Sequence, residues 1–100
     1  MKKICVEEHW GSPEMEEIRT QWRARTGFPV SMDPKALPLL APRLRDFEQT
    51  RLPLMDEAGV TMQVLSTSSP GVQGLADAAT AVPTARRINE AQAEIIHKLY

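Results

Sequence analysis

Residues 4–9 read Ile4-Cys5-Val6-Glu7-Glu8-His9, a short apolar run followed directly by charged and ligating side chains. The apolar run predicts a buried strand, and alternate side chains of a strand point to the same side. Glu7 and His9 would therefore emerge together where this strand ends, while Glu8 would face away. Parallel sheets bind their ligands at that edge, so Glu7 and His9 form a candidate metal half-site. The alternative is a solvated charged cluster.

Composition restricts the classes of protein to which this strand can belong. The chain has 100 residues, an apolar fraction of 42% and a formal net charge of −1, which suit one globular unit. This charge provides no footprint for nucleic acid or an anionic membrane, and no stretch approaches the roughly 20 apolar residues of a membrane span. Cys5 is the single cysteine, so we expect no internal disulfide and a reducing cytoplasmic location.

The residues after this strand predict a helix that ends near Gly27. Ser12 is a suitable N-cap, and Met15, Ile18 and Trp22 recur at helical spacing to form one apolar stripe. This stripe indicates packing against a core. Trp22 has a second interpretation, because an aromatic residue near the mouth of a site can line a substrate pocket.

Residues 28–42 contain closely spaced prolines, which predict an irregular excursion rather than a helix or a central strand. These prolines are Pro29, Pro34, Pro38 and Pro42. The segment is longer than an ordinary connection, so we expect a shaped loop or lid.

The second half of the chain predicts half of a parallel β/α unit. An amphipathic helix over residues 44–58 should be kinked by Pro53 and stopped by Gly59, and residues 60–65 then form a second buried strand. A helix is expected over residues 77–99, where Pro83 should bend or divide it. His97 lies off its apolar stripe and is expected on the surface.

The loop after the second strand starts with Ser66-Thr67-Ser68-Ser69-Pro70. It leaves the same predicted sheet edge as Glu7 and His9, so it is either an ordinary polar loop or part of a substrate pocket. The chain has no Gly-x-Ser-x-Gly elbow, which disfavours a catalytic serine. Two strands alone leave both sheet edges open, and we therefore expect these residues to open a larger β/α fold.

Three blocks together resemble the metal-dependent decarboxylases of the amidohydrolase superfamily, the group that includes the γ-resorcylate, 2,3-dihydroxybenzoate and 5-carboxyvanillate decarboxylases. Residues 3–10 are similar to the first strand of that family, residues 51–60 to its first barrel helix, and residues 63–73 to its second strand and loop. Their order along the chain also matches the family.

The resemblance implies an α/β fold in which residues 1–100 are the amino-terminal part of a single (β/α)8 TIM-barrel domain. A complete barrel needs roughly 250 residues, so the barrel is incomplete in this chain. Residues 11–42 would be a lid-like insertion after the first strand. Glu7 and His9 match the Glu-x-His metal ligands of the family, whose other ligands and catalytic residues are expected beyond residue 100.

The function implied by the resemblance is non-oxidative decarboxylation of a hydroxybenzoate-type substrate with zinc or manganese as cofactor, in a homodimer or homotetramer. The residues expected to contact this small aromatic carboxylate are Trp10, Trp22, Ser66, Ser68 and Pro70. Two alternatives stay open. The first is an amide or lactone hydrolase of the same superfamily, and the second is an inert fragment or an interaction module.

Overall fold

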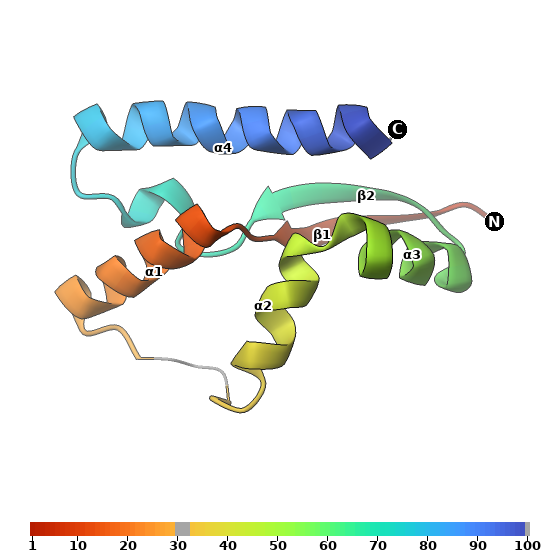
Figure 1. Cartoon of the computed structure of the whole chain (residues 1–100), viewed down its shortest axis with the longest axis horizontal. Coiled ribbons are helices and arrows are strands. Elements are labelled where there is room, and N and C mark those ends of the chain that lie inside the picture. The colour runs from red at the N-terminus through yellow and green to blue at the C-terminus, as the bar shows by residue number, and fades with distance from the viewer. Residues whose placement is uncertain (30–32, 100) are drawn as a thin grey trace.

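The computed structural model describes residues 1–29 and 33–99, which form two strands and the helices that flank them (Figure 1). In chain order the elements are β1 (Lys3–Trp10), α1 (Pro13–Thr26), α2 (Leu37–Arg45), η1 (Phe47–Arg51), α3 (Leu52–Ala58), β2 (Val60–Thr67), η2 (Gly71–Gly74) and α4 (Ala78–Leu99). The two strands pair in parallel, as the sequence predicted.

Both strands extend beyond the apolar runs from which the sequence predicted them. β1 continues through the charged residues to Trp10, opposite Thr67 at the end of β2. The end at Val6 predicted from the apolar run is therefore wrong, whereas the first strand over residues 3–10 implied by the family resemblance is confirmed. Glu7 and His9 lie within the strand, near its carboxyl end. A bulge between Cys5 and Glu8 shifts the register, and such bulges redirect the side chains beside them.

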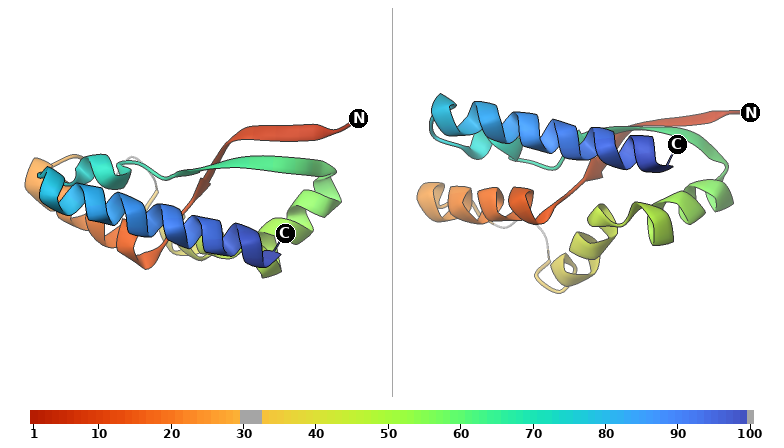
Figure 2. Two further views of the ribbon diagram at one scale, coloured as in Figure 1. Left: turned by 90° about the horizontal axis from the view of Figure 1, so that it is seen from above. Right: turned by 45° about the horizontal axis from the view of Figure 1, so that its top comes forward.

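The helices gather on one side of the strand pair (Figure 2). On that side, residues from β1, α1, η1 and α4 form the core cluster Trp10, Met15, Ile18, Phe47 and Ile88. The opposite face of the strands carries Ile4, Val6, Met62 and Val64, which are 50–69% exposed. The described residues therefore cover one face of the sheet and leave the other face open.

Capping contacts fix the start and end of α1 as the sequence predicted. The Ser12 hydroxyl accepts a hydrogen bond from the amide of Met15, and Gly27 ends the helix with φ +68°. Met15 and Ile18 are buried. Trp22 is only half-buried, and its ring lies 4.9 Å from that of Phe28.

The prolines interrupt helical structure less than the sequence predicted. α2 includes Pro38 and Pro42, so the expectation of an irregular segment is wrong for residues 37–42, while residues 30–32 lie outside the described part. Pro38 stands in the first turn, where helical backbone donors lack partners anyway. Pro42 leaves only three further residues before the helix ends at Arg45.

Pro53 also lies at a helix start, in the first turn of α3, rather than inside one long kinked helix. The π-helical turn η1 precedes it, and the amide of Leu52 donates to the carbonyl of Phe47 across this wide turn. The helix predicted over residues 44–58 is therefore interrupted, but by a wide π-helical turn before Pro53 rather than by a kink at this proline.

α4 is one continuous helix across Pro83, so of the two effects predicted for this proline, a bend or a division, the division does not occur. Ile88 is buried on its inner stripe, and His97 is exposed, as predicted. No described helix is long and apolar enough to cross a membrane.

Candidate active site

His9 and Ser66 occupy facing positions at the carboxyl ends of the two paired strands. The His9 Nδ1 atom lies 3.0 Å from the Ser66 hydroxyl oxygen, within hydrogen-bond distance. Both side chains are exposed, which keeps them accessible to a ligand. The sequence placed both residues at one sheet edge, and the structure brings them into contact.

The strand end that carries His9 is held from the helix side by Arg51, the last residue of η1. Its guanidinium donates to the His9 carbonyl oxygen at 2.6 Å and to the Gln63 side-chain oxygen at 3.1 Å. The same group lies 4.9 Å from the centre of the Phe47 ring, a cation–π distance. One side chain thus joins η1 to both strands beside the candidate ligand.

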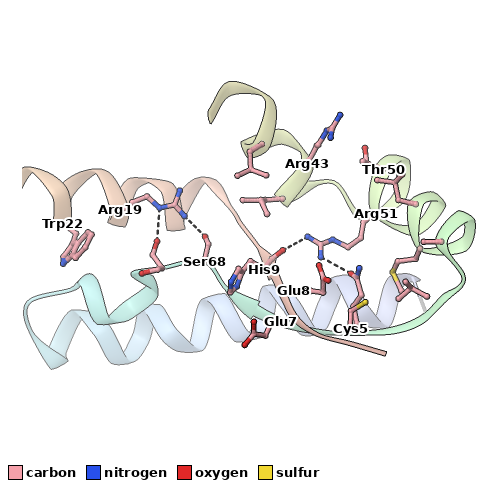
Figure 3. A pocket seen from close by; sticks show the side chains of 18 of the residues that line it. Cys5, Glu7, Glu8, His9, Arg19, Trp22, Arg43, Thr50, Arg51 and Ser68 are labelled. Atoms are coloured by element: carbon pink, nitrogen blue, oxygen red, sulfur yellow. Dashed lines mark hydrogen bonds between the residues drawn. The ribbon is translucent and has the colours of Figure 1, made fainter. Parts of the chain in front are cut away.

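Glu7 and Glu8 take different positions around His9. Glu8 is half-buried opposite Leu65, and in Figure 3 it lies toward Arg51, whereas Glu7 and His9 point away from Arg51. This arrangement agrees with the prediction that Glu8 faces away from the pair. Across residues 1–29 and 33–99, no group of three or more histidine, cysteine, aspartate or glutamate side chains is placed to hold a metal ion.

A cavity of about 770 Å³ opens beside this strand end. The residues that line it include the acidic residues Glu7 and Glu8, His9, the apolar residues Trp22, Phe28, Leu40 and Leu44, and the arginines Arg19, Arg23, Arg43 and Arg51. Apolar walls with a few charged groups are typical of small-molecule sites. The arginines give this cavity a cationic side that suits an anionic ligand.

The predicted substrate-contacting residues do not all lie at this cavity. Trp22 and Ser68 line it, whereas Trp10, Ser66 and Pro70 are not among its lining residues. Trp10 is only 2% exposed and packs against Phe47, so it is part of the hydrophobic core. Contact of any of these five residues with a substrate stays a prediction.

Arg19 and Arg51 contribute to this region and were not recognised in the sequence. Arg19 donates to the Ser68 hydroxyl at 2.6 Å and to the Ser69 carbonyl at 3.0 Å, which anchors the loop after β2 on α1. These contacts join residues 49 and 50 positions apart, and the contact of Arg51 with His9 spans 42. No local spacing in the sequence signals such pairs.

Comparison with known proteins adds to this geometry. No family model matches the chain, but it is 38% identical over 96 residues to a γ-resorcylate decarboxylase of Polaromonas sp. (strain JS666 / ATCC BAA-500). The chain is a homologue of the γ-resorcylate decarboxylases. A second such enzyme, from Rhizobium radiobacter, is 36% identical over 92 residues. These matches cover 96% and 92% of this chain, but only 27% and 25% of the relatives.

Solved structures agree with this homology. A dihydroxybenzoic acid decarboxylase from Polaromonas sp. JS666, with bound manganese and the inhibitor 2-nitroresorcinol, matches with a TM-score of 0.76 and 37% identity. A 2,6-dihydroxybenzoate decarboxylase complexed with 2,6-dihydroxybenzoate matches with a TM-score of 0.77 and 34% identity. They cover 97% and 98% of this chain, which spans 26% and 28% of theirs. The chain therefore has the fold of the opening part of a TIM-barrel decarboxylase, and spans about a quarter of such an enzyme.

Proposed function

We propose that this chain supplies the first two strands and half of the metal site of a decarboxylase that acts on hydroxybenzoates. The observation that carries this proposal is the position of Glu7 and His9 at the carboxyl end of β1, beside a cavity, in a homologue of γ-resorcylate decarboxylases. Because the chain spans about a quarter of those relatives, the activity belongs to a complete barrel.

The chemistry of the two side chains fits a divalent cation. Glu7 offers carboxylate oxygens, and His9 can bind a cation through Nε2 when Nδ1 carries the ring proton and donates it in a hydrogen bond to Ser66. Mixed oxygen and nitrogen donors suit zinc or manganese, and the manganese bound in the Polaromonas structure favours manganese. Two protein ligands are fewer than such a site needs, so the remaining ligands would come from later strands.

Decarboxylation of a hydroxybenzoate places a proton on the ring carbon that bears the carboxylate, after which the bond to that carboxylate breaks and carbon dioxide leaves. When bound, the cation would orient the ortho hydroxyl and carboxylate oxygens and stabilise negative charge.

The residues of this chain would bind and orient the substrate. Trp22 and Phe28 provide an aromatic wall for the ring, and the arginines of the cavity attract its negative charge. The group that delivers the proton is expected beyond residue 100.

The decisive experiment uses the protein encoded by the complete reading frame that contains this chain. We expect stoichiometric divalent metal and release of carbon dioxide from 2,6-dihydroxybenzoate. Glu7→Ala and His9→Ala should lower turnover by more than about 100-fold and remove the metal, because a catalytic metal contributes several kcal/mol. His97→Ala is the matched control, since His97 is exposed on α4 and is not among the cavity-lining residues.

Two results would contradict this assignment. Retention of metal and turnover in both ligand variants would exclude Glu7 and His9 as ligands. Hydrolysis of lactones without carbon dioxide release from hydroxybenzoates would favour the hydrolase alternative instead.

We also infer that the complete protein is a cytoplasmic homodimer or homotetramer with a small aromatic carboxylate as its ligand. The single cysteine suits a reducing compartment, and the net charge of −1 gives no reason to expect a nucleic-acid partner. Light scattering after size-exclusion chromatography would measure the oligomeric state, and a monomer would contradict this inference.

A further inference from the structure

The imidazole ring of His9 has one hydrogen-bond partner among the residues that the structure describes, the hydroxyl group of Ser66. The ring itself is exposed, so without this contact it could rotate about two bonds. The distance of 3.0 Å between Nδ1 and the hydroxyl oxygen is that of a well-formed hydrogen bond. Ser66 is therefore the side chain that can fix the orientation of this ring.

The direction of this hydrogen bond decides what the far side of the ring can do. If Nδ1–H donates to the Ser66 hydroxyl, Nε2 carries a lone pair and can bind a cation. If the hydroxyl donates to Nδ1 of a neutral ring, Nε2 carries the proton and cannot bind one. Only the first arrangement is compatible with His9 as a metal ligand through Nε2.

The backbone places Ser66 where it can hold the ring in that state. Ser66 and His9 face each other across the parallel β1–β2 ladder, so both stand on paired strands rather than on a free loop. The carbonyl of His9 is held separately by Arg51 at 2.6 Å. The ring and the backbone of His9 are thus fixed by two different elements, β2 and η1.

We propose that Ser66 is a positioning residue whose hydroxyl oxygen accepts a hydrogen bond from Nδ1–H of His9 and so presents Nε2 as a metal ligand. Partners of this kind orient the ligating histidines of metal sites, and their loss typically weakens metal binding about 10- to 100-fold. The metal-binding part of this proposal rests on the proposed function. The part that concerns which ring nitrogen of His9 carries the proton does not rest on it, because that can be measured in metal-free protein.

The test compares Ser66→Thr with Ser66→Val in the protein from the complete reading frame. These two side chains have nearly the same shape and differ by one hydroxyl group, and Ser66→Ala serves as a third variant. The dissociation constant for Mn²⁺ is measured by competition with a chelator. We expect Ser66→Thr to stay within about 3-fold of the wild type and Ser66→Val and Ser66→Ala to bind about 10- to 100-fold more weakly.

A matched control on the same strand separates this effect from a general change in β2. Thr61 is an exposed residue with a hydroxyl group near the start of β2, whereas His9 faces Ser66 near the end of that strand. Thr61→Ala should therefore leave the Mn²⁺ affinity unchanged.

The second measurement is ¹⁵N NMR of the histidine ring in metal-free protein, with the His9 signals assigned by their loss in His9→Gln. In the wild type and in Ser66→Thr, we expect the neutral imidazole ring to carry its single proton on Nδ1. In Ser66→Val, the equilibrium should shift toward the form with the proton on Nε2. A merely structural role for Ser66 would not move this equilibrium.

The outcomes separate the two proposals. A wild-type protein that binds no Mn²⁺ overturns the proposed function and with it the metal role of Ser66, while the NMR arm still decides whether Ser66 sets the protonation of the ring. If the wild type binds Mn²⁺ and Ser66→Val binds it equally well, with the same ring protonation, the positioning role is wrong. Equal affinity of all three variants leads to the same conclusion.

Discussion

Arg51 joins three parts of the chain through one guanidinium group: it donates to the His9 carbonyl and the Gln63 side chain and lies over the Phe47 ring. We predict that Arg51→Lys lowers the free energy of unfolding by about 1–3 kcal/mol, because an ammonium cannot reproduce the planar fork of donors. Urea denaturation measures this change. Arg86→Lys, an exposed change on α4, is the control and should stay within about 0.5 kcal/mol. Equal stability of both variants would contradict the structural role of Arg51.

The Asp46 carboxylate should make the stability of the folded protein depend on pH. Its carboxylate accepts hydrogen bonds from the Gln49 amide and the Thr50 hydroxyl, and these contacts lower its pKa below the ordinary value of 3.8. A pKa lowered by folding stabilises the protein above the unfolded value, and this contribution is lost as the pH falls through the folded value.

The measurement is the midpoint of urea denaturation from pH 6 to pH 2.5. The wild type should lose more stability than Asp46→Asn below about pH 4, because asparagine also caps helices but does not titrate. Identical pH profiles for the two proteins would show that Asp46 contributes nothing to this dependence.

The sequence predicted some of these residues and not others for a physical reason. Glu7, Glu8 and His9 are neighbours, so strand alternation alone predicts which of them share a side. The contacts of His9 with Ser66 and Arg51 join residues 57 and 42 positions apart, and they depend on strand register and on the path of η1. Neither is encoded in local spacing, so the anchors of the candidate ligand were found only in the structure.

Among the elements, caps and apolar stripes predicted helices well, whereas prolines misled. Ser12, Gly27 and Gly59 mark the helix ends that the sequence indicated. Pro38 and Pro53 occupy first turns, where the missing amide hydrogen costs nothing, so a helix can begin there. Whether a proline excludes a helix therefore depends on its position in the helix. That position follows from the packing of the helix, which the sequence alone does not show.

Pro83 tests this conclusion, because it is the sixth residue of α4 and lies past the first turn. We predict that Pro83→Ala raises the free energy of unfolding by about 1–3 kcal/mol, since it restores a backbone donor and removes the ring from the helix interior. Thermal and urea denaturation would both show the gain. A loss of stability would mean that α4 needs a bend at Pro83 to reach its packing partners.

For the molecule as a whole, the main feature is the open face of the strand pair. Parallel sheets are normally covered on both faces, yet Ile4, Val6, Met62 and Val64 are 50–69% exposed here. His9 and Ser66 stand at the end of the same two strands. In the complete barrel that we propose, these apolar side chains would lie in the packed interior of the barrel.

This interpretation predicts opposite effects for one substitution in two contexts. In the isolated 100-residue chain, Val64→Asp should reduce the binding of a hydrophobic dye with little change in helical circular dichroism, because Val64 is half exposed. In the protein from the complete reading frame, the same change should cost several kcal/mol, because it would bury a charge without a partner. Urea denaturation of the two forms, each against its own wild type, measures the difference. Equal tolerance in both contexts would show that no further strands cover this face, and the sheet edge that carries Glu7 and His9 would then need another source for its missing ligands.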